Sequence, residues 1–135
     1  MSNLDKYKKD LNSLVSLGSK MSLDLLYRHL EKQGDLEKKD KEDAKKVKGC
    51  FEKEYQRWYT ESCAVIKQLL PDRLVEFEQL YKGDGKRKEI NSRTYNLQDW
   101  LRGITAGKNS FGEKYFEDSA IIANLFSTQL SILKS

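Results

Sequence analysis

Apolar residues recur every three or four positions along most of the chain, which is the spacing of one face of an α-helix. In the N-terminal segment they form an a/d seam with further leucines beside it, and the pattern stops at Gly34. We expect this seam to pack in the core, with a homodimeric coiled-coil seam as the alternative. Gly18 stands where the seam should carry a large side chain, so it predicts either a close helix crossing or a kink at which Ser19 or Ser22 caps a second helix. The seam consists of Leu4, Tyr7, Leu11, Leu14, Gly18, Met21 and Leu25.

A second apolar stripe predicts a long central helix that begins near Asp40 and ends at Leu70. Residues 35–49 are dense in charges of both signs, which predicts that the first part of this helix is solvated. Pro71 ends the helix because its ring clashes with the preceding turn, and it suits the first turn of a following helix that runs to Tyr81. The inward positions of the central helix are Ala44, Val47, Phe51, Tyr55, Trp58, Val65 and Leu69.

Two further patterns predict helices in the C-terminal part. The segment YNLQDWLRG predicts a short helix with Asn96 as its N-cap, Asp99 completing a capping box and Gly103 as its stop. A last helix is expected from roughly Glu113 to Ser135. Its predicted core stripe is Tyr115, Ile122, Phe126, Leu130 and Leu133.

The fold class that these patterns predict is all-α. No segment sustains the alternation of apolar and polar residues that a half-buried strand shows. We expect an irregular helical bundle of about four to five helices with one long central helix, in a single helical domain over residues 1–135. Apolar residues make up 38% of the chain and aromatic residues 10%, which favours a folded, amphipathic protein over a disordered one.

Charge and cysteine content bear on location and partners. The net charge of +4 is mildly basic and compatible with an acidic partner. No apolar tract reaches the roughly 20 residues that cross a bilayer, and the first residues lack the apolar region of a secretion signal. Cys50 and Cys63 fall in one predicted helix, where thirteen residues of rise separate them by roughly 20 Å, too far for a disulfide. We therefore expect a cytoplasmic protein with reduced thiols and no membrane contact.

Patterns of catalytic and metal-binding residues are sparse. His29 is the only histidine, and no cysteine or carboxylate has the spacing to share a metal with it. Leu26 stands where a di-iron bundle would need a glutamate. We predict no metal, no cofactor and no catalytic residue. His29 is interpreted as a solvated helix residue, with a general base as the alternative.

The most concentrated basic patch is the turn KGDGKRK at residues 82–88. Neither a helix-turn-helix pattern nor an aromatic platform interleaved with cations accompanies it. The candidate contacts to nucleic-acid phosphates or to an acidic partner are Lys82, Lys86, Arg87 and Lys88. Further candidates for an acidic partner lie on the charged part of the central helix, at Lys45, Lys46 and Lys48.

Three apolar residues are candidates for a protein interface. Trp100 lies on a short helix between loops, which would present it at a groove, although core anchoring is the alternative. Ile132 and Leu133 keep the last helix apolar up to the C-terminus, which suggests a surface that another protein covers.

The run from Gln56 to Ile104 resembles the N-terminal helical region of an uncharacterised family of bacterial proteins. The likeness rests on Tyr55, Trp58 and Tyr59, on IKQLLPDRLVEFEQLY and on YNLQDWLRG, and with FSTQLSILKS it covers roughly two-thirds of the chain. Longer members of this family carry a C-terminal part that resembles HEPN domains, so this chain is expected to be either a short member or the N-terminal module of a longer protein. The association of this family with HEPN-like domains implies a link to bacterial defence or mobile elements. The HEPN arginine–histidine motif is absent, because no arginine stands four to six residues before His29.

Three functions are consistent with these patterns. The first is a non-catalytic helical interaction or regulatory module that binds a protein partner or a second copy of itself. The second is an electrostatic nucleic-acid-binding protein that uses the basic turn. The third is a nuclease-like enzyme of unfamiliar type, for which His29 is the histidine-based candidate.

Overall fold

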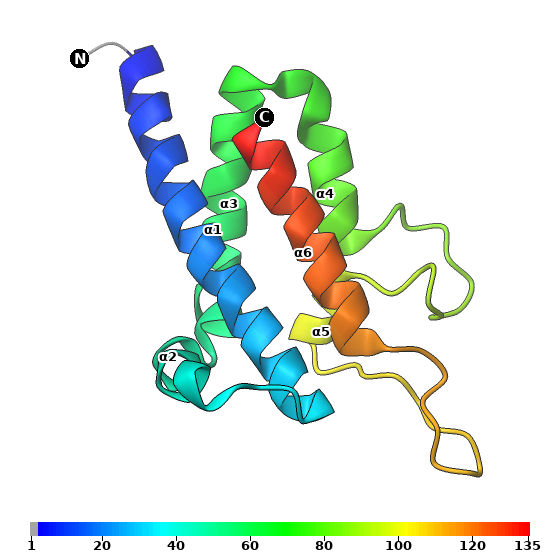
Figure 1. The fold of residues 1–135 in the computed structure, drawn as a ribbon. Helices are drawn as coiled ribbons and strands as arrows, with labels where there is room; N and C mark the ends of the chain where they lie inside the picture. Colours follow the sequence, from blue (N-terminus) through cyan, green and yellow to red (C-terminus); the bar gives the residue numbers. More distant parts are fainter. Residues whose placement is uncertain (1–2) are drawn as a thin grey trace.

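A computed structural model describes residues 3–135 of the chain (Figure 1). Among these residues the chain forms six α-helices and no strand, which confirms the predicted all-α bundle. The helices, with two 3₁₀ turns labelled η, are α1 (Asn3–Gln33), η1 (Lys38–Asp40), α2 (Lys41–Val47), α3 (Cys50–Leu69), η2 (Pro71–Arg73), α4 (Leu74–Lys82), α5 (Leu97–Leu101) and α6 (Asp118–Lys134).

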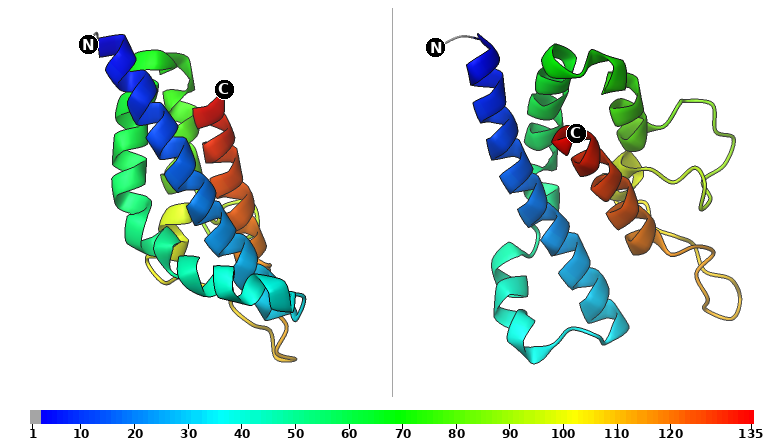
Figure 2. Two further views of the ribbon diagram at one scale, coloured as in Figure 1. Left: turned by 60° about the vertical axis from the view of Figure 1, so that its left-hand side comes forward. Right: turned by 45° about the horizontal axis from the view of Figure 1, so that its top comes forward.

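The longest helix is α1, which has 31 residues and runs the length of the molecule (Figures 1 and 2). It packs against both α3 and α6, and α6 also packs against α4. Their shared core contains a cluster of fully buried aromatic rings, because each helix turns one apolar stripe inward. These rings are Phe51, Tyr55, Trp58, Phe77 and Phe126.

The predicted close approach at Gly18 is present, and α1 continues through it as one helix. The indole Nε1 of Trp58, from α3, donates a hydrogen bond of 2.9 Å to the Leu14 carbonyl of α1. A Cβ atom at Gly18 would lie 2.7 Å from Cδ1 of Leu130 and 3.1 Å from Nε1 of Trp58. Gly18 therefore marks the point where α1 crosses α3 and α6 with no room for a side chain.

Two polar side chains inside the core, Tyr55 and Gln129, are paired, whereas the hydroxyl of the buried Ser62 has no hydrogen-bond partner among the described residues. The Tyr55 hydroxyl donates to Oε1 of Gln129 at 2.8 Å, and Nε2 of Gln129 donates to the Phe77 carbonyl at 3.0 Å. Burial raises the pKa of Tyr55 well above its ordinary value, so the hydroxyl stays protonated and able to donate. This chain of bonds ties α3, α4 and α6 together at a site where an unpaired polar group would be costly.

The predicted central helix is divided in two at Gly49, which corrects the expected single helix from Asp40 to Leu70. Gly49 has a φ of 84°, a left-handed conformation that favours glycine and ends the helical path. The new helix α3 has no side-chain cap of its own, but Asp24 of α1 supplies one, since its Oδ2 accepts from the Phe51 N–H at 3.0 Å. The division explains why six α-helices form where four to five were expected.

The helix α5 begins as predicted. Asn96 accepts a hydrogen bond from the Asp99 N–H at 3.0 Å, and Asp99 Oδ2 accepts one from the Asn96 N–H at 3.0 Å. This is the full capping box expected from the sequence. Gly103 follows the helix with a φ of 81°, as a stop in the left-handed region.

The last helix begins at Asp118, five residues later than predicted, because the preceding segment folds back on itself. Tyr115 N–H donates to the Gly107 carbonyl at 2.9 Å, and Asn109 N–H donates to the Glu113 carbonyl at 2.8 Å. The Tyr115 side chain is 71% exposed, so its assignment to the core stripe of the last helix was wrong.

Replacement of Gly18 by leucine should lower the free energy of unfolding by at least about 2 kcal/mol, since the new side chain overfills a closed crossing. The matched control is Ser16→Leu, because Ser16 is exposed on the same helix. Denaturation in urea should show the control within about 0.5 kcal/mol of the parent chain. Equal stability of the two variants would mean that α1 does not cross its neighbours closely at Gly18.

Candidate functional site

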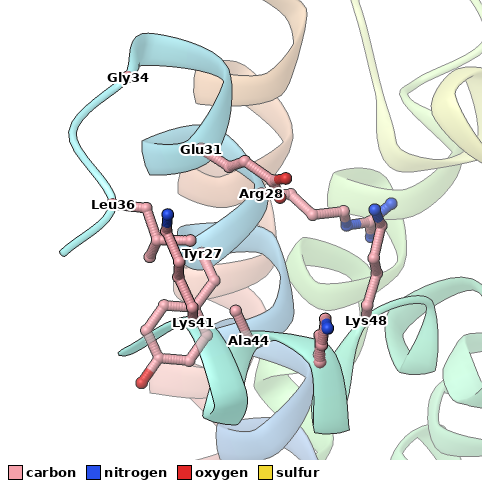
Figure 3. Close-up of a pocket in the computed structure, with 9 residues that line it drawn as sticks. Tyr27, Arg28, Glu31, Gly34, Leu36, Lys41, Ala44 and Lys48 are labelled. Atoms are coloured by element: carbon pink, nitrogen blue, oxygen red, sulfur yellow. The ribbon is translucent and has the colours of Figure 1, made fainter. Parts of the chain in front are cut away.

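The end of α1 and the short helix α2 enclose a cleft of about 410 Å³ (Figure 3). Four cationic side chains line it, Arg28 from α1 and three lysines from α2 and the residue after it, against one anion, Glu31. In Figure 3 the charged ends of Arg28 and Lys48 point toward the same end of the cleft. The three lysines are Lys41, Lys45 and Lys48.

At the other end of the cleft, apolar side chains lie around Lys41, whose nitrogen is next to Leu36 (Figure 3). Tyr27, Leu36 and Ala44 line this end, and the chain between α1 and η1 closes it. The closure follows from Gly34, whose φ of 77° ends α1, while the Asp35 N–H donates back to the Leu30 carbonyl at 2.8 Å. The cleft therefore has cations at both ends, and apolar side chains accompany the cation Lys41 at one of them.

The lysines of the cleft lack partners. Within residues 3–135, Lys41, Lys45 and Lys48 form no ion pair. Lys41 and Lys45 are four residues apart on α2, a spacing at which like charges repel. Lys41 is also the first residue of α2, where the positive end of the helix dipole disfavours a cation. The fold thus leaves three exposed lysines around this cleft.

Arg28 is held rigidly at the end of the cleft that it shares with Lys48. Its Nη1 and Nη2 atoms donate to the two carboxylate oxygens of Glu52 at 2.8 and 2.9 Å, and its Nε lies 3.0 Å from Asp24. The Trp100 indole donates to the same Glu52 at 3.0 Å. Partial burial would raise the pKa of Glu52, but the hydrogen bonds from Arg28 and Trp100 outweigh it and lower that pKa. The network joins α1, α3 and α5 and fixes one wall of the cleft.

His29 lies on a neighbouring face of α1, beside the start of α6. Its Nδ1 lies 3.1 Å from Oγ of Ser119, in a small hollow of about 190 Å³ that Trp100 and Lys32 also line. A serine–histidine contact occurs in nucleophilic catalysis, where a third group orients the histidine. In the described part of the chain no carboxylate contacts the second ring nitrogen of His29. We interpret the contact as a tie between α1 and α6.

A buried carboxylate, Asp118, organises the start of α6. It accepts hydrogen bonds from Lys114 Nζ at 2.9 Å and from the Ala106 N–H at 3.0 Å, and Lys32 Nζ lies 4.0 Å away. Burial would raise the pKa of Asp118, but these hydrogen bonds outweigh it and hold the pKa below its usual value. The neighbouring Lys114 lowers the pKa of Lys32. Asp118 is therefore a structural anion for the loop before α6.

The predicted basic turn is only partly available for a partner. Arg87 forms a bidentate ion pair with Asp99, in which Nη2 lies 2.7 Å from Oδ1, and it also donates to the Thr94 carbonyl at 3.0 Å. Lys82 pairs with Glu78 at 3.4 Å. Lys86 and Lys88 are exposed and form no ion pair within residues 3–135. Arg87 thus anchors the loop to α5, so it is not free to bind phosphate.

The structure places the three interface candidates away from a common surface. Trp100 is half-buried and bonded to Glu52. Ile132 and Leu133 are 1% and 0% exposed, because the end of α6 packs inside the bundle among the other helices. The expected apolar surface at the C-terminal turn is therefore corrected, since those two residues already fill the core of this chain.

Within residues 3–135, no three His, Cys, Asp or Glu side chains are grouped so that they could hold a metal ion. None of the helices in that range combines the length and the apolar character that crossing a bilayer requires.

Comparison of this chain with models of protein families, with curated proteins and with solved structures finds no match. The resemblance to a bacterial family with HEPN-like members thus stays an expectation from the sequence. The site must be interpreted from its own geometry.

Replacement of Asp99 by asparagine should lower the free energy of unfolding at pH 7 by about 1 to 3 kcal/mol, because it removes the partner of Arg87. Burial would raise the pKa of Asp99, but the hydrogen bond from Arg87 outweighs it and lowers that pKa. The stabilisation by the ionised carboxylate is therefore present above the unfolded pKa of about 4 and is lost as the pH falls through the lower folded value.

Urea titrations at pH 7 and pH 3 test this dependence. The difference between the parent chain and Asp99→Asn should shrink at pH 3, while the control Asp72→Asn, at an exposed position, should differ little at either pH. A difference that is unchanged at pH 3 would show that ionised Asp99 does not stabilise the fold.

Proposed function

We propose that the protein is a non-catalytic helical interaction module that docks a partner protein at the cleft between α1 and α2. The observation that carries the proposal is the set of three unpaired lysines around a preformed cleft. Among the described residues, exposed lysines without an ion pair also occur elsewhere, for example Lys86 and Lys88, but here three of them line one cleft together with apolar side chains, which favours an external partner.

The behaviour of α2 supports a docking role. This helix has seven residues, fewer than an isolated helix needs for stability in water, and it buries none of them. The core gains nothing from its side chains, so its lysines are not required for packing. Arg28 keeps the opposite wall of the cleft in place, which lowers the cost of ordering a bound segment.

The titration of the carboxylates in these ion-pair networks favours a non-catalytic role. A carboxyl group that acts as a general acid at neutral pH needs a raised pKa. The pKa values of Glu52, Asp99 and Asp118 are all lowered, since hydrogen bonds and cations outweigh burial at each. These groups remain ionised and act as structural anions.

The proposed setting follows from the sequence. The thiols of Cys50 and Cys63 are free, which is consistent with a reducing cytoplasm. The family resemblance favours a bacterial protein linked to defence or mobile elements. The proposal covers this setting together with the docking role.

Site-specific photo-crosslinking in cells that produce the protein tests the docking role. A photoreactive amino acid at position 31, on the wall of the cleft, should form a cross-link to a protein. The matched position is Thr60, which is exposed on α3 and does not line the cleft. The cross-link should be absent from position 60 and should disappear when Lys45 and Lys48 are changed to glutamate.

The proposal fails if both positions give the same cross-links, because contact would then be non-specific. It also fails if position 31 gives no protein cross-link. A cross-link from position 31 that survives the two lysine changes would show that the cleft is not the docking surface.

A further inference from the structure

We infer that the partner segment in the cleft is a short acidic peptide stretch that carries an apolar residue next to its carboxylates. This inference rests on the proposed docking role and specifies its ligand. It follows from the charges of the cleft, from its shape and from the acidic residues that surround it.

The charges of the cleft favour an anion. Lys41, Lys45 and Lys48 face one carboxylate in the lining, that of Glu31, and have no ion pair within residues 3–135. Arg28 is already satisfied by Glu52 and Asp24, so the free positive charge comes from the lysines. Lysine binds anions as a flexible point charge, which suits carboxylates arriving at different depths.

The apolar lining favours a hydrophobic neighbour for those carboxylates. Tyr27, Leu36 and Ala44 lie with Lys41 at the end of the cleft away from Arg28 and Lys48, within the same volume of about 410 Å³ (Figure 3). A purely anionic ligand would leave this apolar lining in contact with water. A leucine-sized side chain that enters there gains hydrophobic burial in addition to the ion pairs.

Acidic residues around the cleft disfavour an extended polyanion. Asp40, Glu42 and Asp43 lie on η1 and α2 beside the lysines, outside the cleft lining. They would repel a nucleic-acid backbone that continues past the cleft, whereas a short peptide can end within it. The basic turn adds little binding energy for a nucleic-acid backbone, because Arg87 and Lys82 are already paired with carboxylates. The turn also lies on the side of the bundle away from α2 (Figure 1).

Fluorescence anisotropy with a fluorescein-labelled peptide that carries one Glu-Glu-Leu stretch between glycine and serine residues tests the inference. The parent chain should bind this peptide at least about tenfold more tightly than a Gln-Gln-Leu peptide or a Glu-Glu-Ser peptide of the same length. An oligothymidylate of similar charge should bind more weakly than the acidic peptide. Affinity for the acidic peptide should fall as salt rises.

The matched variants separate the cleft from general charge. The double change Lys45→Glu and Lys48→Glu should weaken peptide binding at least about tenfold. Lys53→Glu with Lys67→Glu alters the net charge equally on the exposed surface of α3 and should leave binding within about twofold, since separated surface charges are screened.

Several results would overturn the inference: no binding of the acidic peptide, equal losses in the two double variants, or stronger binding of the oligothymidylate. If the peptide fails while the cross-link from position 31 persists, the docking role stands and the acidic ligand is wrong. If the Glu-Glu-Ser peptide bound as tightly as the Glu-Glu-Leu peptide, the ligand would need no apolar residue and the inference would be wrong.

Discussion

The crossing at Gly18 is the contact on which the rest of the fold depends. There the Trp58 indole reaches the backbone of α1 and donates to the Leu14 carbonyl, in space that a side chain at Gly18 would occupy. This contact sets the register of α1 along α3. Six residues further, about 9 Å of helical rise, Asp24 meets the Phe51 N–H at the start of α3. One more turn brings Arg28 to Glu52 and fixes one wall of the α1–α2 cleft.

The buried carboxylates of the described residues follow one electrostatic rule. Three buried carboxylates each have a cation within reach: Asp24 has Arg28, Asp99 has Arg87 and Asp118 has Lys114. Breaking such a pair leaves a buried charge uncompensated, so these contacts serve the fold. The lysines of the cleft differ, since they face a preformed hollow and have no internal partner.

Sequence reasoning succeeded where structure is set by local spacing. The capping box of Asn96 and Asp99 spans three residues, and the helix stop at Gly34 lies next to the helix that it ends. It failed where the deciding contact comes from far along the chain. Gly49 divides the central helix because Asp24, 25 residues earlier, caps the second half. The sequence predicted Arg87 as a phosphate contact, because its partner Asp99 lies twelve residues away and is recognisable only in the fold. The cleft was also missed, because its lining combines residues as far apart as Arg28 and Lys48.

Hydrogen exchange of the two tryptophan indole N–H groups, followed by NMR, tests the central claim most directly. The Trp58 N–H is fully buried and bonded across the Gly18 crossing, so it should exchange only when the whole domain unfolds. The Trp100 N–H, bonded to the partly exposed Glu52, should exchange much faster. Equal exchange rates for the two indoles would contradict the account, because α1 would then separate from α3 without global unfolding.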